Sequence, residues 1–216
     1  MTKSSRPYEG LFITIEGGDG CGKSSLAKSL TAEFETRGYQ VVQTREPGGT
    51  PLSEHLRKLL LSVNSYQISK RAEMLLFLAA RVQHIDEVIM PALHKGKIVL
   101  CERFNDSTVA YQACGRHLGM SEVEELCNLV CDGVQPDSTI LLDIDPEIAL
   151  SRVKRKQDRL ESEALQFHKD VRQGYLHLAD KYPDRIILID ATASIKVVFN
   201  KVLEALEPHL LLKPHA

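Results

Sequence analysis

The sequence predicts an α/β fold in which a five-stranded parallel sheet carries helices on both faces. Five short apolar segments alternate along the chain with segments of helical periodicity, the pattern of a parallel sheet that is covered on both sides. A glycine-rich loop lies between the first strand and the first helix. Polar groups follow two further strands. Ligands of such sheets bind at the carboxyl ends of the strands, so these groups predict a binding site.

The loop from Gly17 to Ser24 reads GGDGCGKS and fits the phosphate-loop pattern G-x-x-x-x-G-K-[ST] at every fixed position. Its glycines allow a tight turn that aims backbone N–H groups at an anion, and the following helix start adds its positive dipole end. Lys23 is expected to reach the β- and γ-phosphates, and the Ser24 hydroxyl to ligate Mg²⁺. The loop predicts a P-loop NTPase fold whose nucleotide is bound by Gly17, Gly18, Asp19, Gly20, Cys21, Gly22, Lys23, Ser24 and Ser25.

The remaining elements follow from periodicity and turn signals. Strands are expected at 11–15, 40–44, 97–101, 139–144 and 185–190, each an apolar run. Helices are expected at 24–30, 51–61, 69–93, 107–114, 121–130, 146–154 and 194–206. Ser121 and Glu124 have the spacing of a capping box. No repeat or linker divides the chain, so residues 1–216 are expected to form one domain, with a short mobile lid at about 152–161.

Composition argues against several classes of function. The 216 residues carry a net charge of −2, which gives no bulk attraction to nucleic acid or membranes. No apolar run has the length of a membrane span, and residues 1–10 lack the apolar segment of a signal peptide. Five cysteines without a C-x-x-C pair argue against a disulfide framework or a zinc site. We therefore expect a cytoplasmic protein with no nucleic-acid or membrane partner.

Two arginines at strand ends indicate how the nucleotide is used. Arg45 follows the second strand and Arg103 the third. Because a planar guanidinium suits a phosphate, we expect a second phosphorylated substrate and phosphoryl transfer between nucleotides. The structural alternative is that each arginine pairs with a nearby acid, such as Glu46 or Glu102. The sequence has no guanine-binding N-K-x-D motif, which disfavours a nucleotide-dependent switch.

Four segments, in order, resemble the thymidylate kinase family: FITIEG at 12–17, TREPGGT at 44–50, LFLAAR at 76–81, and ERF at 102–104 followed by Ser107 and by AYQ at 110–112. The resemblance covers about residues 10–192, and TREPGGT is typical of the bacterial form. It implies phosphate transfer from ATP to dTMP for dTTP synthesis, giving dTDP and ADP, with Mg²⁺ and usually in a homodimer. The alternatives are another pyrimidine monophosphate kinase, for UMP or CMP, and a P-loop switch without transfer chemistry.

The resemblance assigns the base-reading residues to two helices. Phe77 matches the residue that stacks on thymine, although the residue pattern alone favours a core position. Arg81 lies one helical turn further and matches the donor to the 4-carbonyl, where cytosine carries an amino group. Thr108 and Gln112 match polar contacts to the pyrimidine edge.

Other family positions concern the sugar, the acceptor phosphate and the metal. Tyr111 matches the residue that closes on the 2′ position, and Asp19 matches the acid that holds the 3′-hydroxyl. Arg45 and Arg103 match ligands of the dTMP phosphate, Arg103 with a catalytic role. Glu102 replaces the family's aspartate before that arginine. We expect a catalytic role for it, and its contact, to Mg²⁺-bound water or to arginine, is left open.

The expected lid, residues 152–161, reads RVKRKQDRLE, and its end resembles the family's D-R-x-E. The phosphate loop has no arginine, and family members of this kind supply one from the lid. Arg155 is the first candidate for a catalytic contact with the transferred phosphate. Arg152, nearer the preceding helix, is expected to be an ATP ligand, and which of the two arginines faces the transferred phosphate is left open. Arg159 is the second candidate, expected to be held by Asp158 and Glu161.

Two further positions lie on the ATP side. Ala191, after the fifth strand, matches the segment beneath the adenine. Cys21 lies in an electropositive loop at a helix start, where a thiol pKa tends to fall. We therefore expect thiol reagents to inactivate the protein and ATP to protect it.

Overall fold

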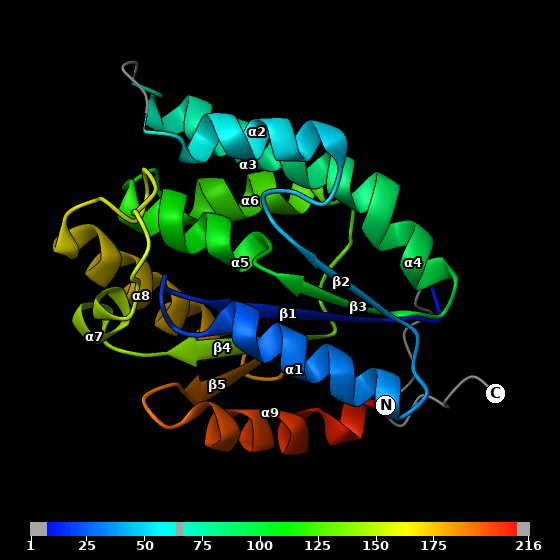
Figure 1. The fold of residues 1–216 in the computed structure, drawn as a ribbon. Helices are drawn as coiled ribbons and strands as arrows, with labels where there is room; N and C mark the ends of the chain where they lie inside the picture. The colour runs from blue at the N-terminus through cyan, green and yellow to red at the C-terminus, as the bar shows by residue number, and fades with distance from the viewer. Residues whose placement is uncertain (1–7, 64–66, 211–216) are drawn as a thin grey trace.

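The computed structural model describes residues 8–63 and 67–210. Its sheet has five parallel strands in the order β2-β3-β1-β4-β5 (Figure 1). The predicted sheet is confirmed, and each strand lies within two residues of its expected bounds: β1 (Leu11–Gly17), β2 (Val41–Arg45), β3 (Ile98–Glu102), β4 (Ser138–Asp143) and β5 (Ile186–Asp190). Residues 1–7, part of the segment that argued against a signal peptide, lie outside the described residues.

The strand register brings the expected binding groups to one edge of the sheet. Glu102, the last residue of β3, pairs with Ile15 of β1 on one side and with Arg45 of β2 on the other. Since all three strands run in the same direction, their carboxyl ends lie side by side. The phosphate loop, Arg45 and Arg103 therefore start from neighbouring positions.

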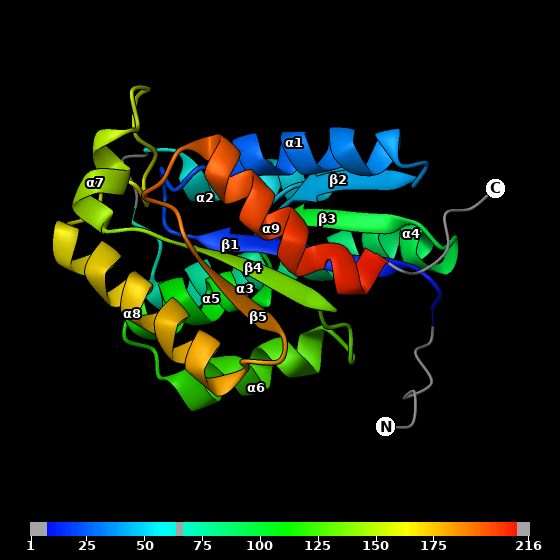
Figure 2. The same ribbon diagram turned by 90° about the horizontal axis from the view of Figure 1, so that it is seen from below.

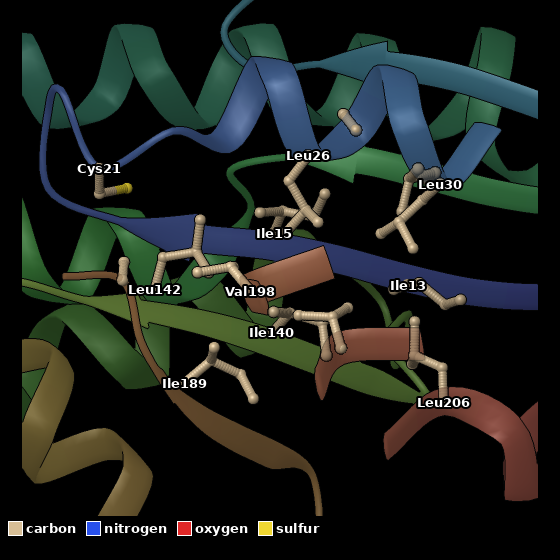
Figure 3. Packing of buried hydrophobic residues seen from close by; sticks show 14 of the residues in the cluster. Ile13, Ile15, Cys21, Leu26, Leu30, Ile140, Leu142, Ile189, Val198 and Leu206 are labelled. Carbon is tan, nitrogen blue, oxygen red and sulfur yellow. The ribbon is translucent and has the colours of Figure 1, made fainter. Parts of the chain in front are cut away.

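Helices cover both faces of the sheet. α1 (Lys23–Thr36) and α9 (Ile195–Leu210) lie across one face, which Figure 2 views from below. Alternate strand residues point to the same face, so Ile13 and Ile15 of β1 pack together against these helices. Figure 3 shows this core, whose members include Ile140, Leu142, Leu26, Leu30, Val198 and Leu206.

The opposite face carries α2 (Pro51–Leu61), α3 (Lys70–His84), α5 (Asn105–Thr108), α6 (Met120–Val130) and α8 (Leu165–Lys181) (Figure 1). Phe12 and Val99 pack there against Ile89 and Leu93, while Leu141 packs in a separate cluster under α8. In the described part of the chain, every helix is too short or too polar to cross a membrane.

Two expected helices contain a wider π-helical segment. The run expected at 69–93 consists of α3, η1 (Ile85–Ile89) and α4 (Met90–His94). Pro91 at the start of α4 has no N–H and its ring needs room in the preceding turn, which the wider η1 supplies. The helix expected at 107–114 begins earlier as α5 and continues as η2 (Val109–Gly115).

Three sequence-based expectations were wrong. α8 was not predicted, although Phe167, Val171, Tyr175 and Leu178 recur at helical spacing and are buried. The charged and polar residues between its members concealed that stripe. The helix expected at 146–154 ends at Ser151, as α7 (Pro146–Ser151). The capping box is absent, because α6 starts one residue earlier, after Gly119, whose φ of 92° suits glycine, and no side chain caps it.

Candidate active site

A cleft of about 460 Å³ opens at the carboxyl ends of β1, β2 and β3. The phosphate loop, the loop after β2, α3, η2 and the expected lid surround it. Most predicted site residues lie on its wall: Asp19, Gly20, Gly22, Lys23, Ser24, Ser25, Arg45, Phe77, Arg81, Glu102, Arg103, Thr108, Tyr111, Gln112, Arg152 and Arg155. The wall does not include the predicted residues Gly17, Gly18, Cys21 and Ala191.

The phosphate loop has a backbone that depends on its glycines. Gly17, Gly20 and Gly22 have φ values of 134°, 80° and 102°. A Cβ at Gly20 would lie 2.0 Å from the Ala149 carbonyl oxygen, so only glycine fits there. Lys23 Nζ donates to the carbonyl oxygens of Gly17, at 3.0 Å, and Gly18, at 2.7 Å. The ammonium group is therefore held close against the loop that is expected to bind phosphate.

Ser24 and Glu102 supply neighbouring oxygen atoms beside the phosphate loop. Ser24 Oγ donates to Glu102 Oε2 over 2.6 Å, and both residues line the cleft. A hydroxyl and a carboxylate are hard oxygen donors of the kind that Mg²⁺ prefers, so the pair fits a magnesium ion bound together with nucleotide phosphates. In the described part of the chain, Arg103 pairs with Asp19, at 2.6 Å, and not with the adjacent Glu102.

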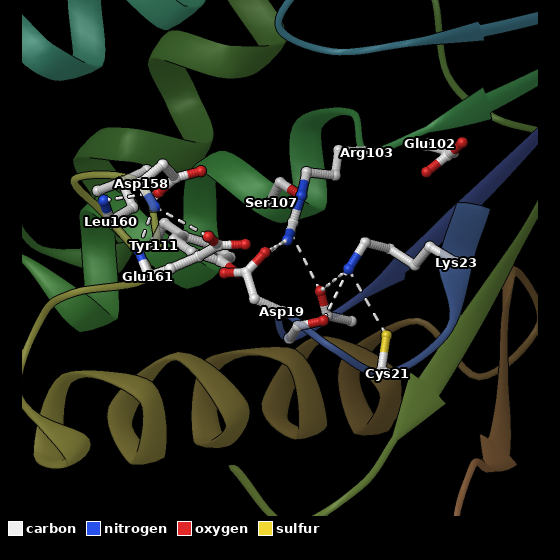
Figure 4. Close-up of polar contacts among 12 residues, drawn as sticks. Asp19, Cys21, Lys23, Glu102, Arg103, Ser107, Tyr111, Asp158, Leu160 and Glu161 are labelled. Carbon is white, nitrogen blue, oxygen red and sulfur yellow. Dashed lines mark hydrogen bonds and ion pairs between the residues drawn. The ribbon is translucent and has the colours of Figure 1, made fainter. Parts of the chain in front are cut away.

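Arg103 lies at the centre of a buried polar network (Figure 4). Its Nη2 donates to Asp19 Oδ1 over 2.6 Å and to the Tyr111 hydroxyl over 3.0 Å, and Tyr111 in turn donates to Asp19 Oδ2. Its Nη1 donates to the same Gly17 carbonyl oxygen as Lys23 does. Burial alone would raise the pKa of Asp19, but Arg103 and Lys23 lower it to about 2. The aspartate therefore stays ionised between two cations.

Glu16, the last residue but one of β1, supports this network and was missed by the sequence analysis. Its carboxylate accepts from the Phe104 N–H and from Ser107 Oγ, both at 2.6 Å, and from the Tyr175 hydroxyl at 2.9 Å. Both hydroxyls also accept from Arg103 Nη1. Burial, together with nearby Asp106, raises the pKa of Glu16 to about 7. The position of this carboxylate at the end of the apolar run FITIEG could have identified Glu16 as a site residue from the sequence.

In the part of the cleft that is expected to bind the base, the Arg81 guanidinium is buried and four of its five N–H groups have protein partners. Nε donates to Glu46 Oε2 over 2.6 Å, Nη1 to Asn105 Oδ1 and Thr108 Oγ1, and Nη2 to the Phe104 carbonyl, the last three all at 2.9 Å. A guanidinium has five N–H bonds, so one, on Nη2, has no partner among the described residues. That N–H is available to a ligand, since Arg81 lies on the cleft wall.

Phe77 and Arg45 both line this cleft. Phe77 is half-buried and packs at the edge of the core cluster under α8, so it is both a core neighbour and a cleft residue. Arg45 pairs with Glu54 at 3.0 Å and not with Glu46, whose partners are Arg81 and His84. Both strand-end arginines therefore pair with an acid, as the structural alternative expects, although neither partner is the adjacent Glu46 or Glu102.

Arg57 of α2 is a cleft residue that the sequence analysis missed. It donates to the Pro47 carbonyl over 2.9 Å, and burial together with neighbouring Arg45 lowers its pKa. Arg57 and Leu61 are four residues apart and both line the cleft. Because α2 starts directly after the TREPGGT loop, this spacing could have identified Arg57 as a cleft residue from the sequence.

The expected lid is an irregular segment between α7 and α8. Arg155 makes a two-pronged ion pair with Glu161, at 2.7 and 2.5 Å, and its side chain is 64% exposed. Arg152 donates to the carbonyl of buried Ala191. Arg159 is not held by Asp158 and Glu161 as expected.

Arg159 is instead fixed outside the cleft. Its Nε donates to the Leu60 carbonyl and its Nη1 pairs with Glu73, both at 2.7 Å. The backbone N–H of Arg159 also donates to the Leu61 carbonyl. These contacts tie the end of the lid to the last turn of α2 and to α3. The second candidate for a phosphate contact is therefore wrong in this conformation.

Cys21 is only 4% exposed and its sulfur lies 3.6 Å from Lys23 Nζ. The expectation of a thiol open to reagents is wrong for this conformation, because the loop buries the sulfur. All five cysteines are free, in agreement with the expected absence of a disulfide framework.

Comparisons with known proteins show the family of the chain. A family model described as thymidylate kinase matches residues 15–202. A thymidylate kinase of Protochlamydia amoebophila is 51% identical, over 94% of this chain and 95% of its own length. Those of Pelobacter propionicus and Bacillus cereus are 41% and 42% identical, over 96% and 94% of this chain and 99% and 100% of their own. The chain therefore belongs to the thymidylate kinase family.

Proposed function

We propose that this protein transfers the γ-phosphoryl group of ATP to dTMP, giving dTDP and ADP. The observation that carries the proposal is the single cleft that joins a phosphate loop at one end to the Phe77 and Arg81 wall at the other. Arg103 lies between them and touches the loop backbone directly. A donor phosphate and an acceptor phosphate can therefore meet beside one guanidinium.

On the donor side, the backbone of residues 17–24 and Lys23 would hold the β- and γ-phosphates. Lys23 must leave the carbonyl oxygens of Gly17 and Gly18 to do so. Ser24 and Glu102 would hold Mg²⁺, which neutralises charge on the phosphates when bound. Arg152 reaches the carbonyl of Ala191, the position assigned beneath the adenine.

On the acceptor side, three cationic groups, Arg45, Arg57 and Arg103, would bind the dTMP phosphate. Phe77 supplies a ring for the base to stack on, and Arg81 offers its remaining N–H to the 4-carbonyl. Asp19 and Tyr111, already bonded to each other at 2.7 Å, would meet the sugar at its 3′ and 2′ positions. A ribose 2′-hydroxyl would then collide with a group that is fixed from two sides.

The lid supplies the planar cation that the phosphate loop lacks. Arg155 lines the cleft and forms an ion pair with Glu161 in this conformation. The Arg155 side chain is 64% exposed, so it can exchange this ion pair for contacts with the transferring phosphoryl group, while buried Glu161 keeps the backbone N–H of Asp158 as a donor. Closing the lid over both substrates would also exclude water from the reaction.

The homodimer is proposed from the outer surface of α2 and α3. Leu52 and Leu59 are seven residues apart on α2 and are 50% and 36% exposed, while Leu75 and Val82 are seven apart on α3 and are 55% and 36% exposed. A spacing of seven places each pair on one helical face, and α2 and α3 pack side by side at the top of Figure 1. A second copy would cover this apolar stripe.

We assign the activity to the cytoplasm, as expected from the sequence.

The test is ATP-dependent ADP release measured with dTMP, UMP, CMP and no acceptor. The proposal expects dTMP to give the highest kcat/KM, and ADP release to depend on the acceptor. A preference for UMP or CMP would indicate the other pyrimidine monophosphate kinase. Slow ADP release that no acceptor changes would indicate a switch without transfer chemistry.

A further inference from the structure

Glu73 of α3 is a buried carboxylate whose acceptor positions are all used. Only 1% of the residue is exposed. Oε1 accepts from Gln112 Nε2 at 2.9 Å and from Arg116 Nε at 3.1 Å, and Oε2 accepts from Arg116 Nη2 at 3.1 Å and from Arg159 Nη1 at 2.7 Å. Burial alone would raise the pKa of Glu73, but hydrogen bonds from Arg116 and Gln112 lower it. Glu73 is therefore an ionised group that can only accept.

This fixes the direction in which the amide of Gln112 points. An amide carries a donor nitrogen and an acceptor oxygen, and a half-turn about its last bond exchanges them. If the oxygen faced Glu73, it would stand 2.9 Å from a carboxylate oxygen, with no proton between them. The nitrogen must face Glu73. Gln112 is 2% exposed and lies on the cleft wall, and its oxygen has no partner in the part of the chain that the structure describes.

Gln112 is placed next to the residue that would read the 4-carbonyl of the base. Thr108, four residues earlier on the same helical run, accepts from Arg81 Nη1 at 2.9 Å. Arg81 and Gln112 therefore line adjacent parts of one wall. In a pyrimidine, the atom next to the C4 substituent is N3. Thymine and uracil carry a proton there, whereas cytosine presents a lone pair.

We propose that Glu73 is a positioning residue for acceptor choice: it turns the Gln112 amide so that an oxygen, and not an N–H, faces N3 of the base. The inference rests on the proposed function, because it assumes a pyrimidine bound with its 4-substituent at Arg81. Two independent donor–acceptor contacts then select the same bases. Arg81 donates at position 4, and Gln112 accepts at position 3. Cytosine is mismatched with both.

The Glu73 carboxylate contacts both Gln112, on the cleft wall, and Arg159, in the lid segment. Arg159 belongs to the lid segment, and Arg116, the other cation on Glu73, also pairs with Glu163 beyond the lid at 2.6 Å. A substitution of Glu73 therefore has two effects that must be separated, one on the amide and one on the ion pairs. Arg159→Ala provides the matched control, because it removes an ion pair from Glu73 and leaves the amide facing a carboxylate.

The experiment uses Glu73→Gln in the full chain. Glutamine has nearly the same shape, but its amide can accept from or donate to Gln112, so the Gln112 amide is no longer fixed. The probes are dUMP and dCMP, which differ only at positions 3 and 4 of the ring, measured as inhibition constants against dTMP. The preference for dUMP over dCMP is expected to fall about tenfold, the order of one matched contact exchanged for a mismatched one. The KM for dTMP should rise while kcat changes less.

Two further variants decide whether the effect passes through Gln112. Arg159→Ala is expected to keep the wild-type preference, whatever it does to turnover. Gln112→Leu should lose the preference, and adding Glu73→Gln to it should change nothing more. An unchanged preference in Glu73→Gln or in Gln112→Leu overturns the inference, as does an equal loss in Arg159→Ala. If Glu73→Gln does not fold, an unchanged preference for dUMP over dCMP in Gln112→Leu still overturns the inference.

The outcome is distinct from a failure of the proposed function. A wild-type protein that does not phosphorylate dTMP refutes the function itself. A wild-type protein that phosphorylates dTMP, with variants that keep its preference for dUMP, refutes only the role of Glu73.

Discussion

Replacing Glu16 with glutamine is expected to change how the stability of the protein depends on pH. The carboxyl is fully buried and lies near Asp106, which is itself paired with Arg185 at 2.7 Å. Its pKa is raised from an ordinary 4.5 to about 7. Glutamine has the same shape and no charge, and its oxygen can still accept from the Phe104 N–H. The variant therefore isolates the effect of ionising this one group.

The sign follows from which state holds the proton more tightly. A pKa raised in the folded state means that the folded protein binds this proton more strongly than the unfolded chain. The contribution of Glu16 to stability is therefore complete below pH 4.5 and is lost as the pH rises to about 7. At about 1.4 kcal/mol for each pH unit, the whole loss is roughly 3 kcal/mol, most of it between pH 5 and pH 8.

The assay is urea unfolding of both proteins at pH 5 and at pH 8. Comparing each variant with wild type at the same pH removes the contributions of other titrating groups. The free energy of unfolding of Glu16→Gln, relative to wild type, should be larger at pH 8 than at pH 5 by about 2–3 kcal/mol, because only wild type loses stability as Glu16 ionises. Hydrogen bonds lost in the variant shift both values equally and leave this difference intact. A difference near zero would refute the reasoning, because Glu16 would then ionise as it does in the unfolded chain.

Three further variants test the proposed site by activity. Lys23→Ala should abolish transfer while circular dichroism stays native, since the lysine acts through charge; near-normal turnover would reject the phosphate-loop assignment. Phe77→Ala should raise the KM for dTMP about tenfold by removing a stack worth about 1–3 kcal/mol, with little change in ATP affinity. An equal loss of ATP binding would make Phe77 a core residue only. Arg155→Ala should lower single-turnover transfer by about 10³-fold, with partial rescue by lysine, which lacks the planar fork. Transfer within a few-fold of wild type would leave the lid as a cover.

The parts of the fold that could be predicted are those marked by a local sequence pattern. The five strands and the phosphate loop follow from apolar runs and a fixed motif, and their carboxyl ends meet because parallel strands share a direction. α8 was missed because its apolar stripe is hidden among charged residues.

Within the site, the residue types were predictable and several partners were not. Arg103 and Asp19 were assigned separately, and their 2.6 Å contact spans 84 positions of sequence. Arg159 was expected to bind its neighbours in the lid and instead reaches Glu73. Glu16 and Arg57 were not proposed, because each is a single residue whose role comes from elements distant in sequence. Such contacts are set by tertiary packing, which periodicity does not encode.

The backbone at Arg103 has a consequence for attempts to engineer this protein. Its φ of 69° lies in the left-handed region, which costs a non-glycine residue on the order of 1–3 kcal/mol. Glycine or asparagine would relieve this backbone cost, so a library designed from backbone geometry alone would choose them. Either replacement would remove the guanidinium that contacts Gly17, Asp19 and Tyr111. Removing one partner of a largely buried ion pair costs about 3–5 kcal/mol, more than the strain, so this position should be held constant in any stabilisation library.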